Sequence, residues 1–246
     1  MSFKLNANMV LSAPGALVSA RLSFIAIDNA RRLFGICPKF VARAIKGAGA
    51  FSCGGATFNS NGPTLVARGP SLQASSLIGY FGLAPRQEID LKIPRRTSSP
   101  FDVLGTPVFV HGAPRNSTLV LDRIGVSVPA PDAGDLIEGF LELQSEDASI
   151  PTNGTLLVDG DGRGVCILVG RVGASYLAVG LEDCLVALGL GPIAHPEQIM
   201  DFGEEIGADD EVHHSLIAKS AESANAAPSG QLLDILSEFE VGATYG

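Results

Sequence analysis

The chain has 246 residues, 46% hydrophobic content and a mean hydropathy of +0.29, which is enough for a sizeable buried core and excludes wholesale disorder. Its 26 acidic residues outnumber its 17 basic residues and give a formal charge of −9, so we expect no nucleic-acid-binding surface. No apolar run reaches the roughly 18 residues of a transmembrane helix, so we expect no membrane association. The 29 glycines and 15 prolines imply many turns and short elements, which favours a mainly β architecture.

The first 47 residues contain the basic segment of the chain. Apolar residues recur every three or four positions from Leu17 to Phe34, which predicts an N-terminal amphipathic helix packed on a β body. Pro38 interrupts this pattern, and we expect the helix to resume over 41–46. The basic side chains either face solvent or form a contact for an acidic partner. They are Arg21, Arg31, Arg32, Lys39, Arg43 and Lys46.

The cysteines and the N-terminus favour a cytoplasmic protein. The four cysteines form no C-x-x-C pair and have no histidine at ligand spacing, so we expect no metal site. Cys166 and Cys184 lie in apolar surroundings and are expected to be small buried hydrophobes. Asn6, Asn8 and Pro14 interrupt any apolar stretch near the start, so we expect no signal peptide. The sequence has no GxGxxG, P-loop or HExxH motif, so no cofactor is expected.

From residue 48 onward the sequence changes to short apolar runs separated by Gly, Pro, Asn and Asp, which is typical of strands and turns. Their regular spacing predicts barrels or a sandwich. Residues 59–62 and 159–162 resemble hairpin turns, because Asn, Asp and Gly tolerate positive φ. The second also resembles part of a calcium loop but lacks the closing glutamate, so we expect a plain turn. The predicted strands are 56–59, 64–67, 76–81, 89–93, 107–111, 118–122, 125–128, 139–143, 155–158 and 165–169.

The C-terminal part of the chain begins with a helical pattern and ends in an acidic tail. Leucines recur at helical spacing over 177–188, and Gly189 follows as a C-terminal cap. We expect an acidic tail over 194–246 that is partly helical and partly flexible, with an Ala/Ser-rich linker over 218–230. Apolar residues over 232–239 predict a short terminal helix, which either docks on the body or folds in the groove of a partner.

Two stretches resemble the second barrel of bacterial trypsin-like serine peptidases, which have the chymotrypsin fold. The first, over 105–126, contains GTPVFVHGAP followed by LVLDRIGV. The second, over 152–190, contains TNGTLLVDGDGRGVCILVGR and then LEDCLVALGL, in the order nucleophile loop, strand, hairpin, strand and closing helix. The resemblance implies a chymotrypsin-like double β-barrel. Its expected parts are an N-terminal helical segment (1–47), a first barrel (48–104), a second barrel with a closing helix (105–193) and the acidic tail (194–246).

The resemblance also implies where catalytic groups should lie. In these peptidases a histidine deprotonates a serine hydroxyl, an aspartate orients the histidine, and backbone N–H groups bind the oxyanion. Asn153 falls at the nucleophile position, where its amide cannot replace an activated hydroxyl. Gly69 or Pro70 falls at the histidine position, and the sequence has no histidine before His111. Asp90, in the segment IDLKI, matches the aspartate position, so we expect a degenerate triad that lacks its serine and histidine.

A displaced catalytic site remains open on other residues. Ser149 and Thr155 carry hydroxyl groups close to the nucleophile position. His111 is the histidine of the predicted β body, with Ser117 and Asp122 nearby in sequence. A lone histidine on a strand is more often structural than catalytic.

We therefore predict a catalytically inactive pseudopeptidase that acts as a protein- or peptide-binding, regulatory module. Its binding site is expected at the former nucleophile loop, which consists of Thr152, Asn153, Gly154 and Thr155. A second hypothesis is a self-assembling structural subunit of a shell, capsid or tail, since short strands and terminal segments of opposite charge suit a homo-oligomer. A third is a serine hydrolase with a displaced nucleophile.

Overall fold

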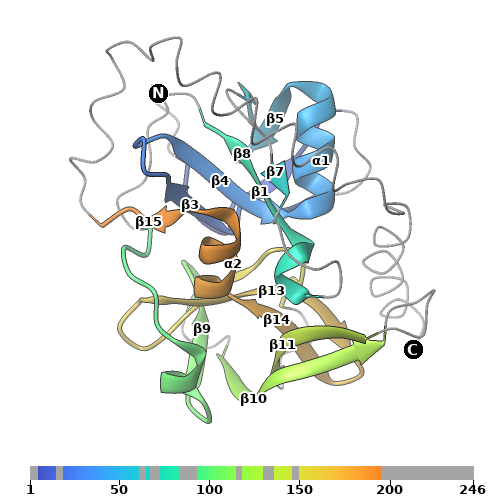
Figure 1. Ribbon diagram of the computed structural model, residues 1–246, viewed down its shortest axis with the longest axis vertical. Helices are drawn as coiled ribbons and strands as arrows, with labels where there is room; N and C mark the ends of the chain where they lie inside the picture. Colours follow the sequence, from blue (N-terminus) through green and yellow to red (C-terminus); the bar gives the residue numbers. More distant parts are fainter. Residues whose placement is uncertain are drawn as a thin grey trace.

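A computed structural model of the chain describes residues 5–14, 19–60, 65–66, 73–83, 93–114, 118–129, 136–145 and 150–194. These residues form two β-rich units, one above the other in Figure 1, with a short helix between them. The predicted tail beyond residue 194 and nearly all of the predicted strand over 89–93 lie outside the described residues. The same holds for the second half of the predicted turn over 59–62.

The first unit consists of two antiparallel sheets, which pair in the orders β2-β1-β5-β6 and β15-β3-β4-β8-β7. Large apolar side chains from both sheets form one core, in which Leu11, Leu22, Ile25, Phe51 and Phe81 are fully buried. The last strand, β15, follows the second unit in sequence and returns to pair with β3. The strands are β1 (Val10–Ser12), β2 (Ala20–Arg21), β3 (Phe24–Ile27), β4 (Leu33–Pro38), β5 (Ala50–Cys53), β6 (Ala56–Asn59), β7 (Leu65–Val66), β8 (Ile78–Gly82) and β15 (Gly191–Pro192).

The helix predicted from Leu17 to Phe34 is wrong, because β2, β3 and the start of β4 occupy this segment. Every residue of β3 and β4 is buried, so these strands are continuous apolar runs rather than one face of a helix. The turn between them is closed by Asp28, whose carboxylate accepts the backbone N–H of Arg32 at 2.8 Å and pairs with its guanidinium at 2.6 Å. This local turn brings β3 and β4 together as a hairpin.

The helical pattern that resumes after Pro38 is confirmed as α1 (Lys39–Ala48). Its apolar face, which includes Val41 and Ile45, packs into the core of the first unit. Gly49 ends the helix in a left-handed conformation with φ of 64°, and its N–H donates to the carbonyl of Ile45 at 2.8 Å. α1 lies beside β8, as the right-hand side of Figure 1 shows.

The second unit is a closed antiparallel barrel with the strand order β10-β11-β14-β13-β12-β9. The predicted segments 118–122 and 125–128 form a single strand, whose register is interrupted at Gly125, with φ of 75°. The turn predicted over 159–162 is confirmed: the Asp159 carboxylate accepts the N–H groups of Asp161 and Arg163, both at 2.9 Å. The strands are β9 (Pro107–Val110), β10 (Thr118–Pro129), β11 (Leu136–Gln144), β12 (Leu156–Val158), β13 (Gly164–Val172) and β14 (Ser175–Gly180).

The closing helix begins four residues later than its leucine spacing predicts. Residues 177–180 belong to β14, where they pair with β13 and in part with β11, and α2 (Leu181–Leu188) follows directly. Gly189 caps α2 in the left-handed conformation, as expected, with φ of 66°. Leu177 is buried in the barrel strand and Leu185 on the helix, so both contribute to the core.

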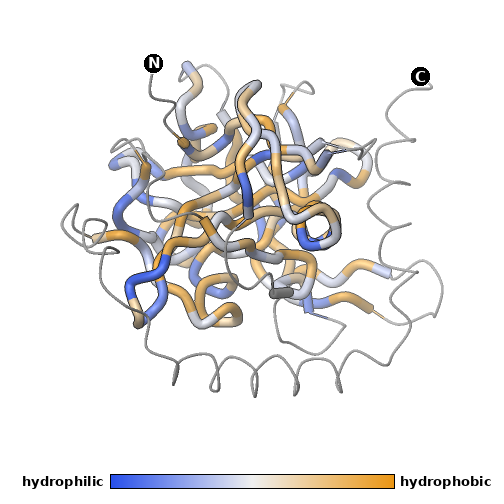
Figure 2. Tube along the Cα trace, turned by 90° about the horizontal axis from the view of Figure 1, so that it is seen from above, coloured by the Kyte–Doolittle hydropathy of each residue, from blue (hydrophilic) through white to orange (hydrophobic). Residues whose placement is uncertain are grey.

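A shared apolar core joins the two units. Figure 2 shows hydrophobic segments running through the middle of the molecule, with hydrophilic segments mainly at its margins. Buried side chains from β3, β4 and β8 meet side chains from the barrel and α2, so the interface between the units is itself a hydrophobic core. Its members are Ala7, Phe24, Ala26, Phe34, Ile36, Ala74, Leu77, Ile78, Tyr80, Ile137, Phe140, Leu156, Ile167, Val169, Leu177, Val179, Leu181, Cys184 and Leu185.

Asn8 adds a polar connection between the units. Its backbone N–H donates to Leu22 of the first unit at 2.7 Å. Its side-chain Nδ2 donates to the carbonyls of His111 and Leu156 at 2.9 and 3.1 Å, and its Oδ1 accepts the N–H of Leu156 at 2.6 Å. Asn8 is 8% exposed and has φ of 64°, a conformation that asparagine tolerates better than most residues. One amide therefore makes three hydrogen bonds to the backbone of the second unit, two of them buried.

We expect Asn8→Ala to lower the free energy of unfolding by about 2–4 kcal/mol, because it leaves the buried N–H of Leu156 without its partner and removes the bonds from Nδ2 to the Leu156 and His111 carbonyls. Asn8→Gly loses the same bonds without the strain of positive φ. It should lower the free energy of unfolding by about 1 kcal/mol less than Asn8→Ala does. Urea unfolding of both variants measures the two contributions. An unfolding free energy of Asn8→Gly equal to that of the parent would show that the amide bonds contribute nothing.

Candidate functional site

The predicted binding residues form a loop between the two units, directly before β12. We call residues 152–155 the inter-barrel loop. Asn153 accepts the backbone N–H of Arg21, in β2 of the first unit, through its carbonyl at 2.7 Å. The N–H of Gly154 lies 2.9 Å from the carbonyls of both Leu168, in β13, and Thr152. The loop is therefore tied by its backbone to both units.

Gly154 packs closely against the first unit. It is buried and has φ of 85°. A Cβ atom at this position would lie 2.8 Å from each of the Arg21 carbonyl oxygen, Ser23 Oγ and Pro38 Cδ. Glycine is required here both by its backbone conformation and by the absence of space.

The side chains of the loop provide no activated nucleophile. Asn153 is half-buried and carries an amide. Thr155 is 1% exposed, and its buried Oγ1 has no hydrogen-bond partner among the described residues. A hydroxyl becomes a nucleophile only when a base accepts its proton, so Thr155 is not activated in this arrangement.

The residues of the first unit that face Gly154 are Arg21, Ser23 and Pro38. Pro38 is the last residue of β4, and its fixed ring packs against the loop directly before α1 begins. Pro70, Gly69 and Asp90, which we expected at the histidine and aspartate positions, lie outside the described residues. All four histidines of the sequence lie at or after position 111, so no residue of 1–110 can supply an imidazole.

The backbone N–H and carbonyl of His111 both form structural hydrogen bonds. It follows β9, its N–H donates to the carbonyl of Leu156 at 3.1 Å, and its own carbonyl accepts Asn8 Nδ2. Asp122 lies on the exposed side of β10, 3.7 Å from the guanidinium of Arg123, and so does not orient the histidine. Ser117 and Ser149 lie outside the described residues.

The cysteines are also unsuited to nucleophilic chemistry. Cys37, Cys53, Cys166 and Cys184 are free and buried, as the apolar surroundings of the last two predict. Burial raises the pKa of Cys53 to about 12 and raises the pKa values of the other three thiols further. The thiolate, which is the reactive form, is therefore absent near neutral pH.

Lys39 is a feature that the sequence analysis missed. It is half-buried as the first residue of α1, directly after the proline that contacts Gly154. Burial, and then the nearby charge of Arg43, lower the pKa of the Lys39 amine to about 8. The positive end of the helix dipole also disfavours a cation at this position. In the sequence, Lys39 is one of several basic residues. Only the packing of the folded chain shows that its pKa is lowered.

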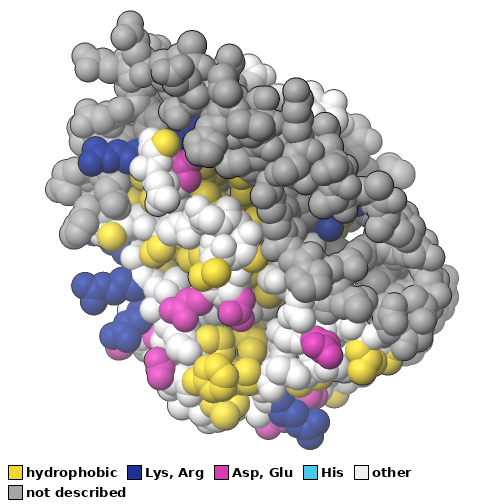
Figure 3. Space-filling model, viewed as in Figure 1, with side chains coloured by type: hydrophobic (Ala, Val, Ile, Leu, Met, Phe, Trp, Pro, Cys, Tyr) yellow, Lys and Arg dark blue, Asp and Glu magenta, His cyan; other side chains and the backbone are white. Residues whose placement is uncertain are grey.

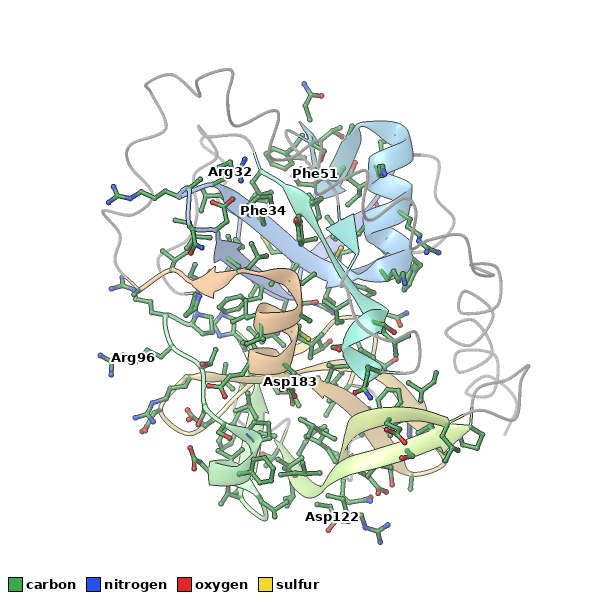
Figure 4. All side chains as sticks on the ribbon, viewed as in Figure 1. Arg32, Phe34, Phe51, Arg96, Asp122 and Asp183 are labelled. Carbon is green, nitrogen blue, oxygen red and sulfur yellow. The ribbon has the colours of Figure 1, made fainter. Side chains whose placement is uncertain are left out.

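Other charged groups are spread over the molecule. Figure 4 shows Arg32, Arg96, Asp122 and Asp183 at separate places rather than around a common point. Burial, and then the neighbouring charge of Glu182, raise the pKa of Asp183 at the start of α2.

Among the described residues, no group of three or more His, Cys, Asp or Glu side chains converges as metal ligands would. The described helices are all too short or too polar to span a membrane.

Comparison with solved structures supports the architecture. The chain is similar to alpha-lytic protease homolog N4 (TM-score 0.57, 18% identity, 76% of this chain and 98% of that chain). It is similar to a glutamic acid-specific serine protease described as using a novel histidine triad in substrate binding (TM-score 0.55, 13% identity, 76% and 100% covered). It is also similar to a Nocardiopsis protease (TM-score 0.54, 11% identity, 77% and 99% covered). The chain has the chymotrypsin-like serine protease fold.

The predicted mainly β, chymotrypsin-like architecture and the resemblance to chymotrypsin-fold proteases are thus confirmed at the level of fold. No family model matches the sequence, and no curated protein matches it. Identities below 20% establish the chymotrypsin-like fold alone, so the chemistry must be judged from the residues at the inter-barrel loop.

Gly154→Ala is expected to lower the free energy of unfolding by about 2–4 kcal/mol, since the new methyl group adds strain at positive φ and overlaps Arg21, Ser23 and Pro38. Gly162→Ala is the matched control, because Gly162 has a similar φ of 79° but open space around its Cβ position. The control should lose only about 1 kcal/mol. Equal losses in urea unfolding would show that the contact with the first unit is not tight.

Lys39→Gln should raise the free energy of unfolding at pH 7, where the native state holds a partly desolvated cation. The folded pKa near 8 lies below that of an unfolded lysine, so the unfolded parent binds more protons from about pH 8 to about 10.4. The parent therefore gains stability as pH rises through this window, and the advantage of the variant should shrink. Urea unfolding at pH 7 and pH 10 tests this, with Lys46→Gln as the control. The same advantage at both pH values would contradict the lowered pKa.

Proposed function

We propose that this chain is a catalytically inactive protein of the chymotrypsin-like fold that binds a protein or peptide segment at the inter-barrel loop. The observation that carries the proposal is the chemistry at the contact between the units. The loop holds the amide of Asn153, and the facing residues of the first unit are Arg21, Ser23 and Pro38. Hydroxyls are present on both sides, at Thr155 and Ser23, but the first unit has no imidazole to activate one, as acyl transfer requires.

The absence of histidine before position 111 supports inactivity independently of any alignment. In this fold the base and the nucleophile come from different barrels, as the resemblance to serine peptidases implies. A first unit without an imidazole cannot supply that base. The buried Thr155 hydroxyl does not replace the missing pair, because it has no hydrogen-bond partner among the described residues.

Two features support a role in binding protein or peptide. The similar solved structures are named as proteases, whose substrates are polypeptides. In the described part of the chain the sheets of the first unit are open, so an extended peptide can add a strand to an edge without any catalytic group.

The surface of the second unit also suits contact with protein. Phe101 and Val186 are 74% and 81% exposed. The lower part of Figure 3 shows hydrophobic side chains gathered on the face of the second unit. Exposed apolar side chains favour protein contact over nucleic acid, in keeping with the charge of −9.

Inactivity is tested with a fluorophosphonate probe, read by gel fluorescence and mass spectrometry. Neither the parent nor Asn153→Ser should be labelled, because a serine at 153 would still lack a base from the first unit. Asn153→Ala is the matched control for the Asn153→Ser change. If the parent is labelled and Thr155→Ala abolishes the labelling, the proposal is contradicted. That result would support a hydrolase with a displaced nucleophile.

Binding is tested by panning a random-peptide display library on the full chain and measuring the enriched peptides by fluorescence anisotropy. Asn153→Trp should weaken binding by at least about tenfold, because it fills the space beside the loop. Asp161→Trp, on the exposed β12–β13 turn, should leave the affinity unchanged. Failure to enrich any peptide, together with large particles on size-exclusion chromatography, would favour a self-assembling subunit instead.

A further inference from the structure

A pocket of about 350 Å³ lies where the N-terminal segment meets the second barrel. Three parts of the chain line it: residues 6–9 with Arg21, residues 110–113, and residues 150–151 with Thr155. The bond from Asn8 Nδ2 to the carbonyl of His111 joins two of these walls directly. The volume is within the range of sites that hold small molecules or single side chains.

Arg21 gives the pocket its charge. It is the only Lys, Arg, Asp or Glu among the described residues that line the pocket. Its Nη1 donates to the backbone carbonyl of Asn8, so the guanidinium is held against one wall. Within the described part of the chain no carboxylate pairs with Arg21, whereas Arg32 and Arg163 lie 2.6 and 3.2 Å from Asp28 and Asp161.

The other lining residues favour an anion that carries a short aliphatic stem. Met9, Val110, Ile150 and Pro151 present hydrocarbon to the pocket, and no acidic side chain among the described lining residues opposes an anion. A guanidinium binds a carboxylate through parallel N–H donors, and apolar walls suit a short aliphatic stem. A single cation matches the single charge of a carboxylate.

We infer that this pocket binds the carboxylate of a polypeptide, either an acidic side chain or a free C-terminus, with Arg21 as its counter-charge. The inference does not depend on inactivity of the inter-barrel loop, since a carboxylate site would stand even if the chain cleaved peptides. The pocket and the loop nevertheless share a residue, because the backbone N–H of Arg21 bonds to the Asn153 carbonyl.

The test is a titration of the full ¹⁵N-labelled chain with small peptides, followed by NMR at the amides of Arg21, Gly112 and Ala113. Acetyl-Ala-Glu-amide presents a side-chain carboxylate, and acetyl-Ala-Ala with a free C-terminus presents a terminal one. Acetyl-Ala-Gln-amide and acetyl-Ala-Ala-amide are the neutral controls. At least one carboxylate should give saturable shifts at these amides, and the stronger of the two identifies the source.

Two variants locate the site. Arg21→Gln should weaken binding by at least about tenfold, as expected for loss of a charge-assisted hydrogen bond. Arg123→Gln is the matched control, since its side chain is 70% exposed on β10 and outside the pocket. Ala113→Trp narrows the pocket at an exposed wall residue and should abolish binding with Arg21 intact. Thermal unfolding confirms that each variant is folded.

The inference is overturned if neither carboxylate gives saturable shifts at these amides, or if the neutral peptides bind as well as the charged ones. Unchanged binding by folded Arg21→Gln or by Ala113→Trp would overturn it as well. These outcomes are separate from fluorophosphonate labelling, which bears only on the inter-barrel loop.

Discussion

The packing of the two units depends on a close backbone contact at Gly154. Here Arg21, Ser23 and Pro38 approach so closely that no side chain fits. The apolar core between the units supplies most of the burial, but hydrophobic contact has no direction and does not by itself define an orientation. Orientation comes from directed bonds at the same place: Arg21 to Asn153, and Asn8 to Leu156 and His111.

The same contact holds the inter-barrel loop without using catalytic side chains. The features that hold the inter-barrel loop are a glycine, backbone hydrogen bonds and a proline ring, and none of them requires a serine or a histidine side chain. The packing of the two units at this loop therefore does not depend on a catalytic triad, which is compatible with the proposed role in binding.

Local sequence predicted the second unit well and the first unit poorly. In the barrel, short strands alternate with turns whose residues demand particular conformations, such as Gly125 and the Asp159 turn. In the first unit, the apolar residues from Leu17 to Phe34 also fit helical spacing, because strands buried on both faces carry no alternation. Leu177 was likewise assigned to the closing helix, since an apolar residue suits either the end of a buried strand or the first turn of a helix.

The sequence by itself determined that this chain is β-rich, acidic and without a histidine in its first 110 residues, and its motifs pointed to the correct fold. It also placed Asn153 in a loop, because glycine and threonine flank it before a buried strand. Only the tertiary structure decided that Arg21 and Pro38 meet that loop, that Lys39 is desolvated and that a pocket surrounds Arg21. The reason is physical: composition and turn chemistry act within a few residues, whereas the contacts of Arg21 and Pro38 with the loop join segments more than a hundred residues apart, and the pKa of Lys39 depends on burial in the folded chain.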